Sequence, residues 1–210
     1  MTGFVDLPEA SRCLWAKSAD GLGHGLLAHM LDVAAVALTI LRRESPRSQE
    51  RMAAGLGLPN PGGEYWIALL VGLHDYGKGI PGFQAKWPEG RLRDEAAGLP
   101  FDTFSLRVTD HACATAALLY DALGTRAGAP PQWVDDVLQA ISAHHGFNFG
   151  RREIDSAHPP GEKKAWKQTR QAIFEAYWDT LAPPGAPHLE ELSLPMVAWL
   201  AGLTSVADWI

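Results

Sequence analysis

The sequence predicts an all-α protein, and three observations favour that class. Two stretches, Leu26–Leu41 and Glu64–His74, carry apolar residues at helical spacing on almost every face, as helices at the centre of a bundle do. No run of alternating apolar and polar residues is long enough to indicate a sheet. The 210 residues, 47% hydrophobic and 20% charged, suffice for one globular domain with its own core. We therefore expect a single helical domain over residues 1–210.

The first half of the chain alternates buried helices with connections. Residues 1–23 are expected to form a loop-rich lead-in, from which Trp15 could dock onto the body. The helix over 26–41 follows, and the charged, then Gly- and Pro-rich stretch 42–63 is interpreted as a connection. After the second buried helix, which Gly77 helps to end, a short helix begins at Pro81. Residues 88–101 are expected to be an irregular loop.

The second half contains further helices with recognisable ends. Asp110 is a good N-cap for a helix running to Gly124. A pair of prolines opens the next helix, over 132–145, and Gly146 closes it. A polar loop over 147–161 precedes an amphipathic helix over 162–181. After a proline-rich break, Ser193 is expected to cap a final apolar helix over 194–210.

Polar side chains that can bind metal ions interrupt these apolar helices. Burying such a group without a partner costs roughly 2–7 kcal/mol for a neutral group and more for a charge, and a metal ion is one partner that removes the cost. The intervals between them are each about one helix and one loop, so a bundle could direct all of them to one interior point. They are His29, His74, Asp75, His111, His144, His145 and Asp208.

Five imidazoles and two carboxylates exceed the three or four protein ligands of a single zinc ion. Two divalent ions with one bridging carboxylate would use the whole set. An imidazole-rich shell suits Fe, Mn, Co, Ni or Zn better than Mg. The sequence thus predicts a two-metal site, with the identity of the ions left open.

Each candidate also has an ordinary explanation when taken alone. A buried histidine such as His29 is commonly a satisfied core residue, and His111 or Asp208 could lie at the surface. The pair His144-His145 could simply favour a helix C-terminus. The ordinary explanation weakens because all of these residues occur at helical positions facing an apolar core. The remaining histidines, expected in solvated loops, are His24, His158 and His188.

The order H…HD…H…HH…D on helices resembles the HD-domain metal-dependent phosphohydrolase superfamily. More narrowly, the chain resembles the HD nuclease domain of the CRISPR-associated nuclease-helicase of type I systems. The metal-ligand pattern alone is shared by the whole superfamily, and the lead-in and the closing segment are what point to the nuclease domain. The segments that carry it are Leu14–Ser18, Leu26–Ala34, Leu73–Lys78 with Pro81–Gln84, Ile141–Gly146 and Leu200–Trp209.

The resemblance implies an antiviral endonuclease and exonuclease acting on single-stranded DNA. It implies one ion held by His29, His74, Asp75 and Asp208, and another by Asp75, His111, His144 and His145. Asp75 would bridge the two ions, and Lys78 would stabilise charge on the phosphate or orient the attacking water. A crRNA-guided surveillance complex would recruit such a domain, and a helicase in cis or in trans would feed it.

One departure from that family concerns the helicase. The sequence contains no Gly-x-x-x-x-Gly-Lys-Thr/Ser phosphate loop, so we expect no helicase motor in this chain. The chain is then an excised domain, a separately encoded nuclease, or an incomplete sequence. Its net charge of −6 argues against non-specific coating of nucleic acid but not against a local cleft.

Composition sets limits on location. We find no membrane span and no signal peptide, and the two cysteines, Cys13 and Cys113, form no C-x-x-C motif. These features favour a reducing cytoplasm.

Two other functions remain open at this point. One is an HD phosphohydrolase acting on a nucleotide or cyclic dinucleotide, which would need a closed pocket. The other is a non-catalytic domain whose ions are structural. Phe147 and Phe149 could stack on bases if the substrate is a single strand, or could pack in the core.

Overall fold

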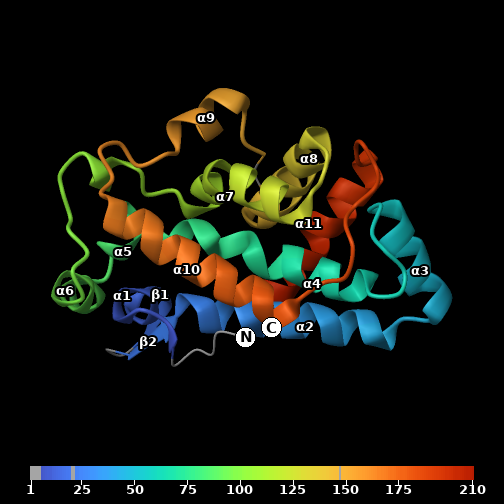
Figure 1. The fold of residues 1–210 in the computed structure, drawn as a ribbon, viewed down its shortest axis with the longest axis horizontal. Helices are drawn as coiled ribbons and strands as arrows, with labels where there is room; N and C mark the ends of the chain where they lie inside the picture. Colours follow the sequence, from blue (N-terminus) through green and yellow to red (C-terminus); the bar gives the residue numbers. More distant parts are fainter. Residues whose placement is uncertain (1–5, 20–21, 147) are drawn as a thin grey trace.

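The computed structural model describes residues 6–19, 22–146 and 148–210. In this part of the chain the fold is helical, with one short antiparallel hairpin, so the predicted class is confirmed (Figure 1). The first elements in chain order are α1 Glu9–Cys13, β1 Trp15–Ala19, β2 Leu22–Gly25, α2 Leu26–Arg43, α3 Pro46–Gly55, α4 Gly63–Gly72, η2 Leu73–Gly79 and α5 Pro81–Gln84. The remaining elements are α6 Pro88–Ala96, η3 Ser105–Arg107, α7 His111–Ala127, α8 Pro131–Ser142, η4 Ala143–His145, α9 Arg151–Ser156, α10 Lys164–Leu181 and α11 Leu194–Trp209.

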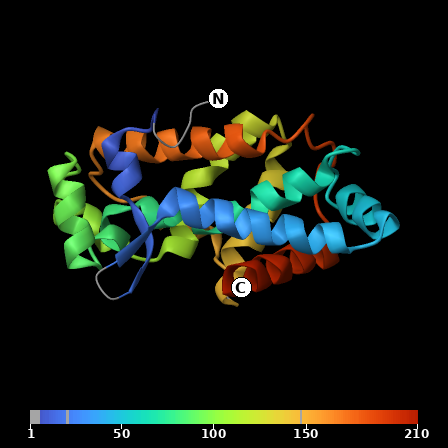
Figure 2. The same ribbon diagram turned by 90° about the horizontal axis from the view of Figure 1, so that it is seen from below.

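The continuous segment of α4 and η2 runs through the middle of the bundle. In Figure 1, α2 lies along one side of it and α7 with α8 along the other, and Figure 2 shows α10 and α11 flanking α2. Every residue from Trp66 to Gly79 is buried, which fits a sequence stretch that is apolar on all faces. The middle of the molecule is therefore where the apolar run meets His74 and Asp75.

Three tryptophans of the core each also secure a connecting segment. Trp66, Trp133 and Trp166 are fully buried. Their indole N–H groups donate to the carbonyls of Pro184, Leu56 and Pro100, respectively, at 2.7–2.8 Å. Since a buried indole N–H without a partner would be costly, these bonds tie three surface segments to the core.

The helix starts predicted after Asp110 and Ser193 are confirmed, but Ser193 makes no side-chain capping hydrogen bond. The Asp110 carboxylate accepts a hydrogen bond from the backbone N–H of Cys113 at 3.1 Å, which confirms it as the N-cap of α7. The cap makes His111 the first residue of that helix. The expected docking of Trp15 is also confirmed, because its ring is buried against Phe83 and Trp87.

Several segments expected to be loops have regular structure. The expectation of no sheet was wrong for the hairpin β1–β2, which was part of the lead-in. Only Trp15 and Ala16 of β1 are buried and β2 is mostly exposed, so no alternation marks the strands. The helices α1, α3, α6 and α9 were also missed. They are short and mostly polar and bury few side chains, so their apolar periodicity is weak.

Two helices end earlier than expected, and both ends carry candidate ligands. The helix predicted over 64–74 ends at Gly72, and the helix predicted over 132–145 ends at Ser142. In each case the chain tightens into a 3₁₀ segment that holds the adjacent His and Asp or His and His residues. Seven residues are unusual for a 3₁₀ helix, which seldom exceeds about four residues, and a 3₁₀ stretch inside a helical segment often marks a functional position.

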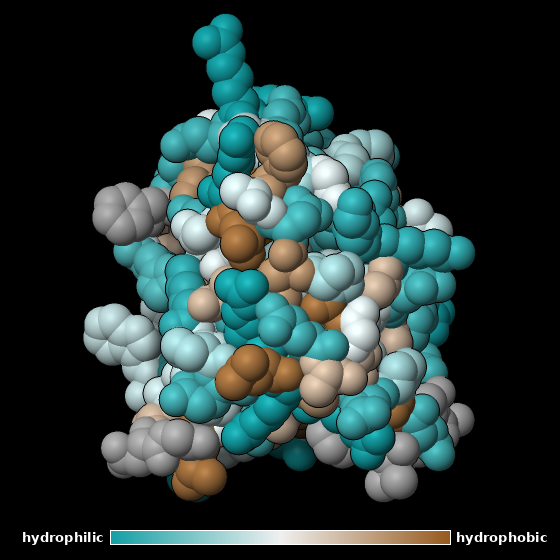
Figure 3. Space-filling view, turned by 90° about the vertical axis from the view of Figure 1, so that its left-hand side faces the viewer, coloured by the Kyte–Doolittle hydropathy of each residue, from teal (hydrophilic) through white to brown (hydrophobic). Residues whose placement is uncertain are grey.

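The surface needs only brief description. Within the described residues, we find no helix that is both long and apolar enough to cross a bilayer. Figure 3 shows that the face at the α6 end is mainly hydrophilic, with hydrophobic residues scattered among the polar ones.

Candidate metal centre

The structure brings all seven candidate ligands together at one end of α2. Their ligand atoms form two groups, within each of which the atoms lie no more than 4.8 Å apart. The carboxylate cluster consists of His29, His74, Asp75 and Asp208. The imidazole cluster consists of His111, His144 and His145.

Five elements supply these side chains. α2, η2, α7, η4 and α11 each contribute one or two, so residues more than a hundred positions apart meet. The contact between η2 and α7 is close: a Cβ on Gly77 would lie 2.0 Å from the His111 carbonyl oxygen. The Thr115 hydroxyl accepts from the Gly77 N–H at 2.8 Å and lies 2.9 Å from the His74 carbonyl. Gly77 therefore allows the approach of η2 to α7, rather than ending a helix.

Two of the imidazoles are oriented by the same local device. The Nδ1–H of His74 donates to the carbonyl of Val71 at 3.0 Å, and that of His144 donates to the carbonyl of Ile141 at 2.8 Å. Each acceptor lies three residues earlier, within reach because the chain is helical. Because Nδ1 is engaged in this way, Nε2 is the nitrogen of each ring that faces the centre, and it can bind a metal ion when the ring is neutral.

Asp75 lies between the two clusters, with one carboxylate oxygen turned toward each. Its Oδ2 lies 2.8 Å from His29 Nε2 and 3.3 Å from His74 Nε2. Its Oδ1 lies 3.2 Å from His111 Nε2 and 3.7 Å from His144 Nε2. Asp75 is 1% exposed, so this arrangement is sheltered from water.

The outer edge of the centre is more open. Asp208 Oδ1 lies 3.3 Å from His29 Nε2 and also pairs with Lys17 from β1. In the imidazole cluster, the Nε2 atoms of His111 and His145 are 3.2 Å apart, and His145 is exposed. Solvent thus reaches the centre from the side of these residues.

Charge differs sharply between the clusters. Burial would lower the pKa of His74, but the negative charges of Asp75 and Asp208 outweigh it and raise the pKa to about 9. Burial would raise the pKa of Asp75, but His74 and the neighbouring imidazoles lower it well below its usual value. Burial, reinforced by the charge on His74, lowers the pKa of His144 to about 4. The pKa of Asp208 is also lowered, against burial, by its imidazole and lysine partners.

The donor set fits divalent cations. Among the described residues, His74 Nε2, His144 Nε2 and Asp75 Oδ1 are buried and have no hydrogen-bond partner. All three face the centre, and leaving such atoms unpaired costs roughly 1–3 kcal/mol each. Cations bound between them would satisfy all three, and the imidazole-rich set matches transition metals.

The other histidines lie elsewhere, with one correction. His158 and His188 are exposed, and His24 is exposed too but belongs to strand β2, not to a loop. Its Nε2 pairs with Asp32 at 2.9 Å, beside the ring of His29. Sequence reasoning overlooked its position because the hairpin was not recognised.

Only one of the two stacking candidates can be placed, and its surroundings give no support for a role in binding DNA. Phe147 lies outside the described residues. Phe149 is half-buried and packs beside Cys113 and Ala157, as the core-packing alternative expected.

Burial of a carboxylate does not by itself mark the centre. Asp94 on α6 is fully buried, and neither of its carboxylate oxygens has a hydrogen-bond partner among the described residues. Burial raises its pKa to about 7, the opposite of Asp75. What distinguishes Asp75 is the ring of imidazoles and Lys78 around it.

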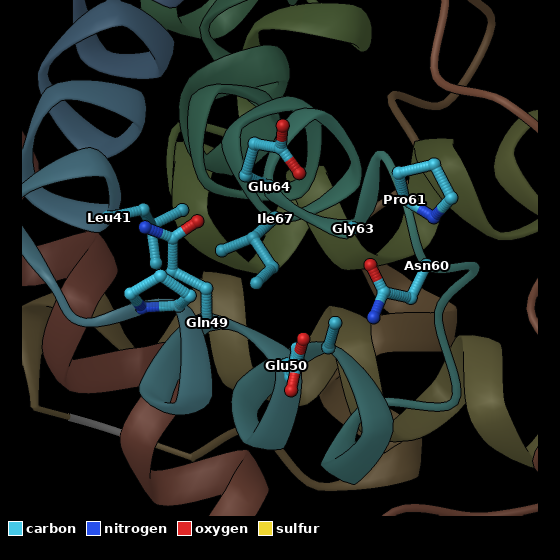
Figure 4. Close-up of a pocket in the computed structure, with 10 residues that line it drawn as sticks. Leu41, Gln49, Glu50, Asn60, Pro61, Gly63, Glu64 and Ile67 are labelled. Carbon is cyan, nitrogen blue, oxygen red and sulfur yellow. The ribbon is translucent and has the colours of Figure 1, made fainter.

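A separate pocket lies at the other end of α2 (Figure 4). It measures about 210 Å³ and is bordered by Leu41, Gln49, Glu50 and Glu64. Leu41 is 12 residues beyond His29, or about 18 Å along the helix. With two carboxylates and no imidazole in its lining, this pocket is unsuited to a transition metal or an anion.

The helical bundle with its buried H…HD…H…HH…D clusters defines the class of HD domains. Within that class the chain belongs to the family described as "Cas3, HD domain", whose model matches residues 15–210.

Relatives of known description agree with this assignment. The chain is 40% identical to the CRISPR-associated endonuclease/helicase Cas3 of Thermus thermophilus, over 98% of the chain but 22% of that protein. It thus spans about a fifth of this relative. It is similar to the crystal structure of the T. thermophilus Cas3 HD domain in the presence of Ni²⁺ (TM-score 0.69, 35% identity, covering 96% of this chain and 76% of that one). It is also similar to a chain of a pre-nicking CRISPR RNA-guided surveillance complex (TM-score 0.74, 26% identity, 93% and 24% covered).

Proposed function

We propose that this chain is a metal-dependent endonuclease and exonuclease that hydrolyses single-stranded DNA in type I CRISPR interference. The observation that carries the proposal is the position of Asp75, whose two oxygens face two different groups of potential ligands. The description of the T. thermophilus relative as an endonuclease and helicase supports the reaction class.

The residues divide the work as follows. His29, His74, Asp75 and Asp208 would hold one divalent ion, and Asp75, His111, His144 and His145 the other. A pair of bound divalent cations supplies an activated water near neutral pH and neutralises charge that develops on the phosphate.

Lys78 contributes charge from the chain itself. It is 7% exposed, and its ammonium pairs with Asp75 Oδ2. Once that oxygen binds an ion, the ammonium remains beside it in a site of low dielectric, where it stabilises negative charge on the phosphate strongly. Lys78 is therefore assigned a transition-state contact.

Access favours a strand over a small nucleotide. Asp75 is buried, whereas His145 and Lys17 at the rim are exposed, so a long substrate can cross the rim and present one phosphate to the interior. A nucleotide or cyclic dinucleotide hydrolase would be expected to enclose its substrate.

Partners follow from the relatives. We propose that a helicase, in cis or in trans, feeds the strand to this domain and that a crRNA-guided surveillance complex recruits it. The helicase fused in the T. thermophilus relative and the complex that contains a similar chain support these roles.

The test is a cleavage assay with purified protein on circular single-stranded DNA in Mn²⁺, Co²⁺ or Ni²⁺, with duplex DNA and nucleotides run in parallel. We expect the circle to be linearised and then degraded by the wild type and to survive with Asp75→Asn. Hydrolysis of nucleotides with the DNA intact would favour the alternative phosphohydrolase. Absence of any cleavage from metal-loaded protein would favour the non-catalytic alternative.

A further inference from the structure

A second lysine stands at the rim of the centre, on an element that the assignments above do not use. Lys17 extends from β1, and its Nζ lies 3.0 Å from Asp208 Oδ1 and 3.3 Å from the Asp208 carbonyl oxygen. The Lys17 side chain is 52% exposed, compared with 14% for that of Asp208. Lys17 therefore marks the point where the buried centre meets solvent.

The backbone that carries Lys17 is held firmly. Gln84 is fully buried, its Oε1 accepts from the Trp15 N–H at 3.1 Å, and its Nε2 donates to the Trp15 carbonyl at 2.8 Å. The same Nε2 donates to the Lys78 carbonyl, also at 2.8 Å. One amide side chain thus joins the segments that bear the two lysines and sets their relative position.

The neighbouring strand brings a histidine to the same edge of the centre. In the hairpin, Lys17 is paired with His24 on β2. His24 contacts Asp32, and its ring centroid lies 6.1 Å from that of His29. The hairpin thus places Lys17 and the His24–Asp32 pair beside the carboxylate cluster.

Both lysines pair with carboxylates that are proposed metal ligands. Lys78 pairs with Asp75 and Lys17 with Asp208. A divalent cation at the carboxylate cluster would take over these oxygens, because it binds them more strongly than an ammonium does. The ammonium of Lys17, on a flexible stem and open to solvent, would then be free to bind an anion arriving at the rim.

We propose that Lys17 binds a phosphate of the single strand at the rim of the centre, on the solvent side, while Lys78 acts from the buried side. This inference rests on the proposed nuclease function. A purely structural alternative would have Lys17 only tether the last turn of α11 to β1.

The test measures binding of a phosphorothioate oligothymidylate, which resists cleavage, to Mn²⁺-loaded protein by fluorescence anisotropy over a range of salt. Lys17→Met keeps the apolar stem and removes the charge, Lys17→Arg restores a cation, and Lys164→Met removes an exposed lysine of α10 as the matched control. We expect Lys17→Met to raise Kd about five- to tenfold and to lower the slope of log Kd against log salt by about 0.7, the value for one lost contact on a single strand. Lys17→Arg should recover most of the affinity, and Lys164→Met should match the wild type. Cleavage kinetics should show a rise in KM larger than the fall in kcat.

The inference is overturned if Lys17→Met keeps the wild-type Kd and salt slope and lowers only the melting temperature or the bound Mn²⁺. That result would leave the nuclease function standing, provided that the wild type cleaves DNA. A wild type that neither binds nor cleaves the strand would overturn both.

Discussion

The carboxylate and imidazole clusters share Asp75 but differ in almost every physical respect. The carboxylate cluster is closed except at its rim: His29, His74 and Asp75 are each at most 3% exposed, and the side chain of Asp208 is 14% exposed. The imidazole cluster is open, since His145 is exposed and the His111 side chain is 17% exposed. Within the described part of the chain, the lysines that pair with carboxylates of the centre, Lys17 and Lys78, both belong to the first cluster.

The difference shows how the centre remains stable without ions. In the carboxylate cluster, two lysines and a protonated His74, with its pKa raised to about 9, more than offset the charge of two carboxylates. In the imidazole cluster, His144 stays neutral because its pKa is lowered to about 4. We expect the carboxylate cluster to hold its ion tightly because it offers two carboxylates and little access to water, and the more exposed imidazole cluster to exchange its ion with solvent.

The largest expected effect comes from removing the shared carboxylate. Asp75→Asn should abolish binding of both ions and lower cleavage of single-stranded DNA by at least about 1,000-fold, since the ions supply several kcal/mol of charge stabilisation and about 1.36 kcal/mol corresponds to tenfold in rate. Elemental analysis and initial rates measure the two effects. Asp94→Asn is the matched control, because it alters a buried carboxylate outside the centre and should keep both ions. Retention of one tightly bound ion by Asp75→Asn would contradict the bridging role.

The next effect separates the clusters. His145→Ala should lower the affinity of the imidazole cluster for its ion and leave the other ion bound. The loss should exceed the roughly 10–100-fold seen when a residue that only hydrogen-bonds to a metal ligand is removed. Asp208→Asn should do the reverse. Metal titration by calorimetry reads both affinities, with His158→Ala as an exposed-histidine control. If His145→Ala releases both ions together, the clusters are one cooperative site and the comparison fails.

Metal loading should stabilise the fold unequally. A ligand at about 100 times its Kd stabilises the native state by about 2.7 kcal/mol. We expect His145→Ala to retain most of the gain in unfolding free energy that the wild type shows on loading, because the tighter ion remains. Asp208→Asn should lose most of it. Urea denaturation with and without chelator provides the measurement, and equal losses in the two variants would argue against a tight and a weak site.

The smallest expected effect is the pH dependence of the chelated protein. The folded pKa of His74, about 9, lies above the unfolded 6.5, so its contribution is present below pH 6.5 and lost as pH rises through 9. The folded pKa of His144, about 4, lies below 6.5, so stability falls as pH drops from 6.5 toward 4.

Two variants should flatten one limb each. Asp208→Asn removes a carboxylate that raises the pKa of His74 and should weaken the alkaline limb, and His144→Gln should remove the acid limb. Both variants should be made in an Asp94→Asn background. The raised pKa of Asp94, about 7, makes stability fall as pH rises from about 4 to 7, and this change would overlap the acid limb. Unfolding free energies from urea denaturation provide the profiles. Identical profiles for the parent and both variants would show that neither histidine causes the pH dependence of the unfolding free energy.

Much of the centre could be predicted because its residues interrupt apolar helices. His29 and His74 are conspicuous in stretches that are otherwise apolar, and Asp110 as an N-cap predicts the helix that begins at His111. Helix order and capping therefore predicted which side chains could meet. A sequence pattern does not indicate which way a carboxylate points. That one oxygen of Asp75 faces each cluster could therefore be seen only in the structure.

The parts that escaped prediction share weak local signals. Gln84 lies in a four-residue helix and acts through contacts with Trp15, 69 positions away. Lys17 lies in a hairpin with few buried residues, and hairpins of this kind produce no hydrophobic period. Long-range contacts between short elements are set by tertiary packing, which a local pattern does not record.

The most direct test of the shared carboxylate is electron paramagnetic resonance of the protein loaded with Mn²⁺. Two ions about 3.5–4 Å apart and joined by one carboxylate are expected to be magnetically coupled. We predict two equivalents of Mn²⁺ per chain with a coupled spectrum in the wild type, and loss of that spectrum in Asp75→Asn but not in Asp94→Asn. Two uncoupled signals, or a coupled spectrum that survives in Asp75→Asn, would contradict the claim that Asp75 joins the two clusters.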